Sequence, residues 1–495
     1  MKILFMYPNA YLSNGVPTGI ATLSSLLKER GHEVDVFDWT FIKTAVRDTT
    51  PTYGTRILLP TRYTLEDLTA DDPVFSLEDA FAEKLQRFRP DLVAVSVLTG
   101  YFDAVIDLLK KVKPSCRVVA GGIHPTICPE DALSFREIDM ICVGEGEEFM
   151  VELCEAMEKG KDITGIRNLG YKTERGTRFN ELRPFVNLDN LPDMDWGIFD
   201  KRHLFRPFQG TVYSGGCFLM SRGCPERCTY CLNWAFRDKF RGCGRYFRFQ
   251  SPQTTGRQIR FLKERYNADF FRFYDESLAL FDEKFLTSLV GELKPLGIKF
   301  ACSLRPETIS KRKVDLLVSM GCVAANIGLE SGNERIRAEI LNRRMSNDQI
   351  RHAVDILKGA NIRVTTFNMI GLPGETRENV FETIELNKSL DIPAVNVYAI
   401  YPYPGTEIYN RFHPRLRDES GMITPVSRAS SFGMSKMTSG EIDGLLRTFE
   451  FYVRLPEDIW PQIQIAEGND ICAEDARKQF QERLTGLSSR SASCC

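Results

Sequence analysis

Long apolar runs, an excess of charge of one sign and internal repeats are all missing from this sequence of 495 residues. No apolar run approaches the ~18 residues that a membrane-spanning helix needs. The formal net charge is −2, from 64 basic and 66 acidic residues, and no basic stripe stands out, which disfavours a nucleic-acid-binding protein. The N-terminus does not read as a signal peptide, because the apolar residues after Lys2 soon meet Pro8 and Asn9.

A disulfide scaffold is not expected either. The 14 cysteines are too sparse for one in a chain of this length, and we therefore expect a reducing compartment, the cytoplasm. Most cysteines stand alone in apolar segments, where free cysteine packs as a small hydrophobe. The five read in this way are Cys116, Cys142, Cys154, Cys302 and Cys322. Cys494 and Cys495 end a Ser-rich tail and receive no role.

The N-terminal part of the chain alternates short apolar runs with amphipathic stretches. This alternation predicts a parallel, doubly wound α/β sheet of the flavodoxin or Rossmann type. The expected strands are residues 3–7, 34–37, 92–97, 117–120 and 140–143, and the expected helices are residues 19–30, 102–113 and 147–159. Such sheets bind ligands beyond the carboxyl ends of their strands. Here those ends carry Tyr7, Gly19, Ser96, the run Gly121-Gly122-Ile123-His124, and Gly144-Glu145.

A second alternating series begins at about residue 213 and predicts a partial (β/α)6 barrel of the TIM type. Its expected strands are residues 218–221, 270–274, 299–303, 324–328, 364–370 and 395–401. At roughly 150 residues per domain the length suggests about three domains. We expect an N-terminal domain at 1–165, a linker at 166–212, the barrel at 213–410, and a C-terminal region at 411–495 that caps the substrate site. Residues 41–80 read as a polar surface excursion.

Three cysteines follow the first expected strand of the barrel in the spacing C-x3-C-x2-C: Cys224, Cys228 and Cys231. Barrel active sites lie at the carboxyl ends of the strands. Three thiolates on one tight loop can bind an iron–sulfur cluster and leave one iron open, whereas electron-transfer clusters usually have four cysteines. An open iron can bind a substrate or cofactor directly. Tyr230, just before the last cysteine, is expected to shield the cluster from solvent.

Two other interpretations of the cysteines compete with the cluster. One is a zinc site with Cys217 or Cys243 as the fourth ligand. The other is three unrelated buried thiols, which a Gly- and Pro-bearing loop disfavours. The position of the three cysteines, at the end of the first expected barrel strand, weighs against zinc. A structural zinc ion usually closes a small loop-rich module and does not lie at the mouth of a barrel.

The cysteine motif at the mouth of a partial barrel resembles the radical S-adenosylmethionine (radical SAM) superfamily. The resemblance extends to motifs after the later strands, and it covers residues 215–407. The segment from Tyr274 to Ser277 resembles the acidic motif that meets the methionyl amino group, and Arg305 resembles the basic contact. Gly328-Leu329-Glu330 resembles the motif near the ribose, and Ile370-Gly371 resembles the one beside adenine. The resemblance thus implies a [4Fe–4S] cluster on the three cysteines and SAM contacts at Tyr230, Asp275, Glu276, Arg305, Glu330, Ile370 and Gly371.

The N-terminal strand ends resemble the cobalamin-binding domain of cobalamin-dependent radical SAM enzymes. The resemblance rests on Gly121-Gly122-Ile123-His124 and on the run from Gly144 to Glu147. It implies cobalamin contacts at Tyr7, Gly19, Ser96, Gly121, Gly122, His124, Gly144 and Glu145. A dinucleotide site is disfavoured, since no G-x-G-x-x-G follows the first strand. A flavodoxin-like interaction domain remains an alternative.

One motif departs from the cobalamin pattern. Cobalamin domains in which a protein histidine replaces the lower axial ligand of cobalt carry the motif D-x-H-x-x-G, and this sequence does not contain that motif. His32 and His124 read as turn histidines, so the resemblance implies cobalamin bound without a protein histidine on cobalt. Some enzymes of this architecture keep the domain yet do not use cobalamin, and that alternative stays open.

The resemblance implies a function as well. One electron from the cluster would cleave SAM to methionine and a 5′-deoxyadenosyl radical, and this radical would remove hydrogen from an unactivated carbon of a small metabolite. Cobalamin would then deliver a methyl group, so we expect a cobalamin-dependent methyltransferase. An external electron donor such as flavodoxin or ferredoxin is implied.

Three other functions compete with methyl transfer. The first keeps the radical but performs dehydration, epimerisation or oxidative cyclisation. The second is a tRNA methylthiotransferase, disfavoured by the near-zero net charge and by the lack of a second cluster pattern among the N-terminal cysteines. The third is a zinc-stabilised binding protein without catalysis.

Overall fold

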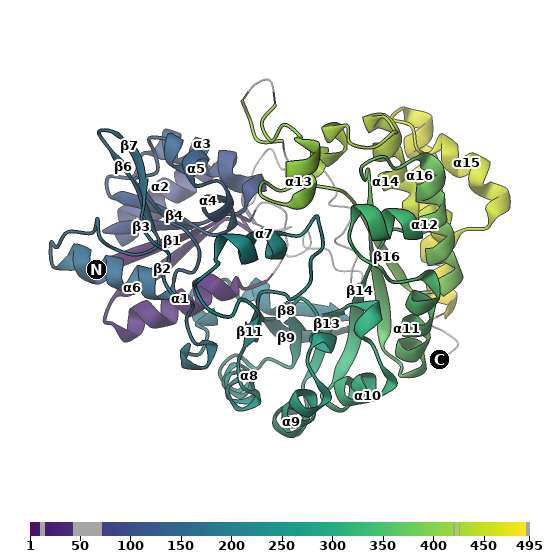
Figure 1. Ribbon diagram of the computed structural model, residues 1–495, viewed down its shortest axis with the longest axis horizontal. Helices are drawn as coiled ribbons and strands as arrows, with labels where there is room; N and C mark the ends of the chain where they lie inside the picture. Colours follow the sequence, from purple (N-terminus) through teal and green to yellow (C-terminus); the bar gives the residue numbers. More distant parts are fainter. Residues whose placement is uncertain (10–14, 43–71, 419–420, 425, 492–495) are drawn as a thin grey trace.

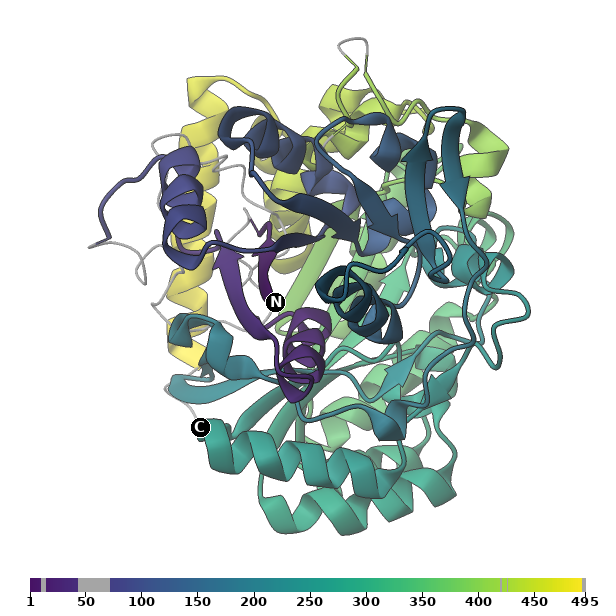
Figure 2. The ribbon, with the colours of Figure 1, turned by 90° about the vertical axis from the view of Figure 1, so that its left-hand side faces the viewer.

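Two seven-stranded sheets form the framework of the molecule, and their strand ends meet at its centre (Figure 1). The computed structural model describes residues 1–9, 15–42, 72–418, 421–424 and 426–491. In Figure 1 the N-terminal sheet lies on the left and the second sheet curves round on the right. Figure 2 views the molecule from the side of the N-terminal sheet.

The N-terminal sheet is doubly wound, as the sequence predicts. Its strands have the order β2-β1-β3-β4-β5-β6-β7, and the first five are parallel. Those five are β1 (Lys2–Tyr7), β2 (Glu33–Asp38), β3 (Leu92–Ser96), β4 (Arg117–Gly121) and β5 (Met140–Cys142). The helices that accompany them are α1 (Thr18–Glu29), α2 (Leu77–Phe88), α3 (Phe102–Val112), α4 (Ile123–Ile127), α5 (Pro129–Ser134) and α6 (Glu147–Glu158).

Helices on both faces explain why the strands are apolar along their whole length. On β1, Ile3 and Phe5 pack into one hydrophobic cluster, while Leu4 and Met6 pack into another on the opposite face. A parallel sheet buried on both sides needs such unbroken apolar runs. Much of the predicted excursion at 41–80 lies outside the described residues, and α2 begins within its last part.

Part of the segment expected as a linker belongs to the sheets instead. The hairpin of β6 (Leu169–Thr173) and β7 (Gly176–Phe179) extends the N-terminal sheet in antiparallel fashion from β5. Further along, β8 (Phe205–Phe208) pairs with the first strand of the second sheet. Apolar periodicity is weak in strands this short and exposed, which is why the sequence did not reveal them.

The second sheet has the order β16-β15-β14-β13-β12-β9-β8, with six parallel strands and β8 antiparallel at the edge. The parallel strands are β9 (Thr211–Phe218), β12 (Phe270–Phe273), β13 (Lys299–Leu304), β14 (Cys322–Glu330), β15 (Arg363–Ile370) and β16 (Ala394–Ala399). The predicted strand 218–221 is therefore misplaced, because β9 ends at Phe218. The short pair β10 (Ser221–Arg222) and β11 (Arg248–Phe249) follows it.

Helices cover the convex face of the curved sheet and leave its carboxyl ends toward the N-terminal sheet (Figure 1). They begin at defined caps; α12, for example, begins after Thr376, which forms a capping box with Asn379. The covering helices are α8 (Pro252–Tyr266), α9 (Glu283–Leu293), α10 (Lys311–Ser319), α11 (Asn347–Gly359) and α12 (Arg377–Leu390). The helix α7 (Leu232–Lys239) lies instead between the two sheets (Figure 1).

The C-terminal region first contacts the N-terminal half through Arg417 and Ile423, and then packs on the outer side of β15 and β16. Its helices are α13 (Glu407–Phe412), α14 (Ser439–Arg454), α15 (Trp460–Ile465) and α16 (Ile471–Ser491). Arg417 forms ion pairs with Asp131 at 2.7 Å and Asp103 at 3.2 Å, so this region bridges the two halves. Among the helices in the described part of the chain, none has the length and apolar character needed to cross a membrane.

The close pairing of β9 with β12 generates a prediction for Gly215. A Cβ atom at this position would lie 1.6 Å from the carbonyl oxygen of Phe270. We expect Gly215→Ala to destabilise the protein by roughly 3 kcal/mol, since the backbone must move to relieve the overlap. Thermal or urea unfolding measures the effect.

Gly291 provides the matched control for this substitution. It lies in α9, and a Cβ there would meet no atom within 4 Å. Gly291→Ala should stabilise the protein by about 0.5–1 kcal/mol, because alanine favours the helix. Equal stability of Gly215→Ala and the parent would contradict the strand pairing.

Candidate functional site

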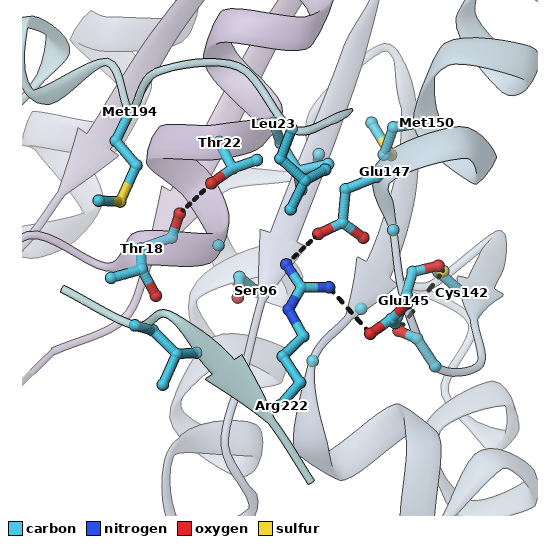
Figure 3. Close-up of a pocket in the computed structure, with 18 of the residues that line it drawn as sticks. Thr18, Thr22, Leu23, Ser96, Cys142, Glu145, Glu147, Met150, Met194 and Arg222 are labelled. Atoms are coloured by element: carbon cyan, nitrogen blue, oxygen red, sulfur yellow. Dashed lines mark hydrogen bonds and ion pairs between the residues drawn. The ribbon is translucent and has the colours of Figure 1, made fainter. Parts of the chain in front are cut away.

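A cavity of about 420 Å³ lies where the carboxyl ends of β1, β3, β4 and β5 face the second sheet (Figure 3). We call it the interdomain cavity. The N-terminal sheet contributes small residues to its wall, among them Thr18, Ser96 and Gly121, and the barrel contributes Leu219 and Arg222. Six of the eight predicted cobalamin contacts line it: Gly19, Ser96, Gly121, Gly122, Gly144 and Glu145.

Glycine is required at two positions of the wall. Gly122 has φ +97°, and a Cβ there would lie 2.9 Å from the backbone of Val97. Gly144 has φ +96°, and its Cβ would lie 2.8 Å from the Phe240 ring. Both conformations belong to the left-handed region that side chains rarely adopt. At Gly19, by contrast, a Cβ would meet no atom within 4 Å, so this residue leaves open space beside α1.

The other two predicted contacts, Tyr7 and His124, lie elsewhere; neither is among the described residues that line this cavity. His124 is fully buried, with Nε2 3.0 Å from Asp131 and its ring 4.1 Å from the Phe102 ring centroid. Ile123, which precedes it, lines the cavity, whereas the His124 side chain packs into the core. Tyr7 lies beside His203, at 6.2 Å between ring centroids.

A buried charge network joins the two sheets at this cavity (Figure 3). Arg222 contacts Glu145 at 2.9 Å and Glu147 at 2.5 Å, and Arg248 also pairs with Glu145. Burial acts to raise the pKa of Glu147, but the Arg222 charge and hydrogen bond hold the pKa below its usual value. Within the described structure the second carboxylate oxygens of Glu145 and Glu147 have no hydrogen-bond partner. Both residues line the interdomain cavity, so these oxygens are buried acceptors at its wall.

The cysteine loop begins two residues after Arg222. Cys224 and Cys228 are buried and Cys231 is half-buried. The Arg305 guanidinium lies 3.2 Å from Cys228 Sγ, and the Asn233 amide lies 3.8 Å from Cys231 Sγ. Burial raises the pKa of Cys224 to about 12 and that of Cys231 to about 11, so these thiols stay protonated until a metal displaces the protons. Donors aimed at sulfur are what bound thiolates need.

Asp275 and Glu276 have different surroundings. Asp275 is 2% exposed and accepts hydrogen bonds from the Ser221 backbone at 2.7 Å and from the Ser221 hydroxyl. Burial raises its pKa to about 6. Its carboxylate therefore holds the start of the cysteine loop. Glu276 faces a cavity.

That second cavity, of about 290 Å³, is named the barrel-mouth cavity. It is lined by Glu276 and Asn233 at the cysteine loop, and it shares Gly122, Gly144 and Arg222 with the interdomain cavity. The two spaces therefore adjoin, and one wall separates the predicted cobalamin site from the predicted cluster.

Glu330 has an unusual backbone and a buried environment. Its φ is +69°, and the pairing of β14 with β15 shifts register beside it. Its carboxylate lies 3.0 Å from the Tyr230 hydroxyl and 2.8 Å from Arg343. Burial raises its pKa, and the Arg343 charge acts in the opposite direction. Strained residues with buried charge are typical of functional sites.

Ile370 and Gly371 occupy a turn that is held from within. Ile370 is fully buried and packs with Ile442 of α14, so its side chain does not face a cavity. The backbone amides of Gly371 and Leu372 donate to Glu375 Oε2 at 2.7 and 3.1 Å. Any ligand here meets the backbone of the turn, which Gly371 permits with φ +79°.

Cys217 and Cys243 lie away from the cysteine loop. A Cβ on Gly15 would lie 2.8 Å from Cys217 Sγ, and the Cys243 carbonyl accepts from the Phe185 amide at 2.8 Å. Among the described residues no group of three or more His, Cys, Asp or Glu side chains is arranged to bind a single metal ion. A zinc site needs four ligands around one ion, whereas the cysteines of a cluster bind different irons.

Comparison with known proteins agrees with these two halves. A model of the radical SAM superfamily matches residues 218–386, and a model of the B12 binding domain matches residues 56–154. The chain belongs to the radical SAM enzymes with a B12-binding domain. The cofactors of this radical SAM enzyme family are a [4Fe–4S] cluster, SAM and cobalamin.

Relatives of this radical SAM enzyme resemble it over most of its length. An uncharacterized methyltransferase of Pyrococcus horikoshii is 28% identical, covering 92% of this chain and 93% of the relative. The anaerobic magnesium-protoporphyrin IX monomethyl ester cyclase of Rubrivivax gelatinosus is 22% identical, covering 91% and 77%. Among solved structures, the radical SAM methyltransferase TsrM of Kitasatospora setae, with cobalamin and cluster bound, has a TM-score of 0.66 at 16% identity, covering 97% and 99%. This structural likeness shows the fold.

Sequence reasoning missed the arginines of the site. Arg222, Arg248 and Arg343 pair with Glu145, Glu147 and Glu330 across long sequence separations. Arg222 lies just before the predicted cysteine loop, and this position was the only sequence signal that could have identified it. Arg248 lies in the two-residue strand β11 and Arg343 in the segment before α11, and only the fold reveals their partners.

Glu375 generates a prediction for pH dependence. Burial raises its pKa to about 8, although the Leu372 and Gly371 amides oppose the shift. Between the unfolded pKa and pH 8 the folded state holds more protons than the unfolded state, so stability must fall as pH rises. Each unit of pKa difference is worth about 1.4 kcal/mol. Glu375→Gln removes this loss, and the thermal midpoints of variant and parent should diverge in favour of the variant from pH 5 to 8. A difference that stays constant over this range would show that Glu375 is not the group responsible.

Proposed function

We propose that this protein is a cobalamin-dependent methyltransferase that acts on an unactivated carbon of a small metabolite. The observation that carries the proposal is the adjacency of the two cavities. The interdomain cavity at the N-terminal strand ends adjoins the barrel-mouth cavity at the cysteine loop, and Arg222 lines both. A cofactor in the first can thus face chemistry in the second.

The N-terminal strand ends are proposed to bind cobalamin. Gly122 and Gly144 allow close approach to the backbone, and Gly19 leaves space. Glu145 and Glu147 present the unpartnered oxygens, which suit the amide groups of a corrin periphery. Tyr7 and His124 have no part in this assignment.

Cys224, Cys228 and Cys231 are proposed to bind the cluster, and Asp275 fixes their loop through Ser221. SAM is assigned to the ends of β12–β15. There Glu276 and Glu330 are acceptors for ammonium and hydroxyl groups, and Tyr230 and Arg343 orient Glu330. Arg305 donates a hydrogen bond to Cys228 Sγ, and the turn at Gly371 offers backbone groups for contact with SAM.

When bound, these cofactors supply the radical that removes hydrogen and the methyl group that replaces it. The chain positions them and excludes water. We further propose the division into residues 1–165, 166–212, 213–410 and 411–495. In this division the last region caps the substrate site, because Arg417 ties it to Asp103 and Asp131. A small-molecule substrate and an external flavodoxin or ferredoxin complete the reaction.

One observation favours a second function. The match to the Rubrivivax gelatinosus relative covers 91% of this chain, and that relative carries the name of a cyclase, not a methyltransferase. Oxidative cyclisation would use the same cluster and SAM residues without methyl transfer.

Product analysis after anaerobic reconstitution tests the proposal. With SAM, cobalamin, reductant and candidate metabolites, we expect both 5′-deoxyadenosine and S-adenosylhomocysteine. Deoxyadenosine without S-adenosylhomocysteine would favour the cyclase function. Cys228→Ala removes one proposed ligand and should lower the iron content and abolish cleavage of SAM by at least a hundredfold.

Cys243→Ala is the matched control. It removes a cysteine that is also buried but lies outside the loop, and iron content and SAM cleavage should stay at the parent level. Zinc in the parent protein, with loss of metal from Cys243→Ala, would refute the cluster assignment.

A further inference from the structure

Two arginines inside the barrel have no acidic partner. Arg206 pairs in register with Tyr213 and shares a strand face with Phe208, whose ring contacts Phe270 in the barrel interior. Arg272 lies two residues beyond Phe270, and so on the same interior face. Neither lies among the described residues that line the interdomain and barrel-mouth cavities.

Neither arginine forms an ion pair with a described residue. The nearby Asp38 carboxylate is paired with His203, whose other ring nitrogen contacts the Gly15 amide. Arg206 is 8% exposed, and its Nη2 has no hydrogen-bond partner in the described structure. For Arg272 the described part of the chain offers only a cation–π contact, 4.7 Å from the Tyr274 ring centroid. No described carboxylate lies within 4.0 Å of either guanidinium. Arg206 is buried and Arg272 is half-buried. A buried charge is normally paired, so an arginine of this kind indicates a charged ligand.

The two guanidinium groups converge on one place. A Cβ on Gly15 would lie 3.7 Å from Arg206 Nη2 and 2.8 Å from Cys217 Sγ, and Cys217 is the register partner of Arg272. The environment of Tyr274 agrees. Its pKa is raised by Cys217 and by burial, and both Arg272 and Arg206 act in the opposite direction. Tyr274 is itself 43% exposed, as expected for a side chain that faces open space.

The opposite wall of the interior is flat and partly polar. The rings of Phe367 and Tyr398 stack at 5.9 Å with 13° between their planes. Asn396 is the register partner of Phe367 and is 2% exposed, and its Nδ2 has no partner in the described structure. Another hydrogen-bond donor therefore faces the same interior.

We infer that Arg206 and Arg272 bind an anionic group of the substrate, a carboxylate or a phosphate, within the barrel. The inference rests on the proposed function and specifies its substrate class. Guanidinium groups suit both anions through paired hydrogen bonds. The arginines assigned near SAM, Arg305 and Arg343, are already paired with carboxylates, so the anion of the substrate has its own site.

Binding of small aromatic anions tests the inference. Benzoate and phenyl phosphate are titrated by calorimetry into the anaerobically reconstituted protein, with benzyl alcohol as the neutral probe. We expect at least one of the two anions to bind, and whichever binds identifies the carboxylate or phosphate class. Arg272→Gln and Arg206→Gln should each weaken that binding at least tenfold, while Arg272→Lys should retain part of it. Benzyl alcohol should bind weakly and equally in all forms.

Arg312→Gln is the control, because Arg312 lies exposed on α10. It should bind the anion as the parent does. Failure of the parent to bind either anion, or parent-like affinity in both glutamine variants, would overturn the inference. Iron and cobalamin contents of each variant separate this outcome from failure of the proposed function. Loss of cobalamin without loss of anion binding would assign the arginines to the cofactor instead.

Discussion

The ion pairs of Arg222 with Glu145 and Glu147 are the interaction on which the arrangement of the site depends. They join the end of the N-terminal sheet to the segment that leads into the cysteine loop, at 2.9 and 2.5 Å. Glu147 is 6% exposed, so its charge is tolerated only while Arg222 is present. The same contact brings the wall of one cavity to the wall of the other.

Local structure prepares both ends of this contact. On the N-terminal side Gly144 turns the chain so that Glu145 and Glu147 leave the strand end toward the barrel. On the barrel side Asp275 fixes Ser221, and β11 carries Arg248 to Glu145. Burying several charges at one interface costs solvation free energy. The ion pairs compensate this cost only when the charged groups keep one relative geometry. The network therefore defines how the two halves meet, and it leaves two carboxylate oxygens without partners for a ligand.

The sequence predicted the repeating parts of this molecule well. Periodicity located all five parallel strands of the N-terminal sheet. The spacing of Cys224, Cys228 and Cys231 predicts the cluster ligands. Periodicity placed β9 too late, because Gly215 and Gly216 interrupt the apolar run, and it missed the exposed hairpin of β6 and β7. Contacts over long separations, such as Arg343 with Glu330, have no local signature. His124 is the opposite case. It follows Gly122 closely in the sequence, but its side chain is buried in the core and does not line the interdomain cavity.

The most direct measurement is the amount of cobalamin that remains bound per chain after anaerobic reconstitution and desalting. We expect about one equivalent in the parent protein, because the interdomain cavity is the proposed cobalamin site. Arg222→Met should retain several-fold less, because it leaves Glu147 buried without its counter-charge at the cavity wall. A parent protein that retains none would contradict the assignment of the cavity. Full retention by Arg222→Met would contradict the role of the network.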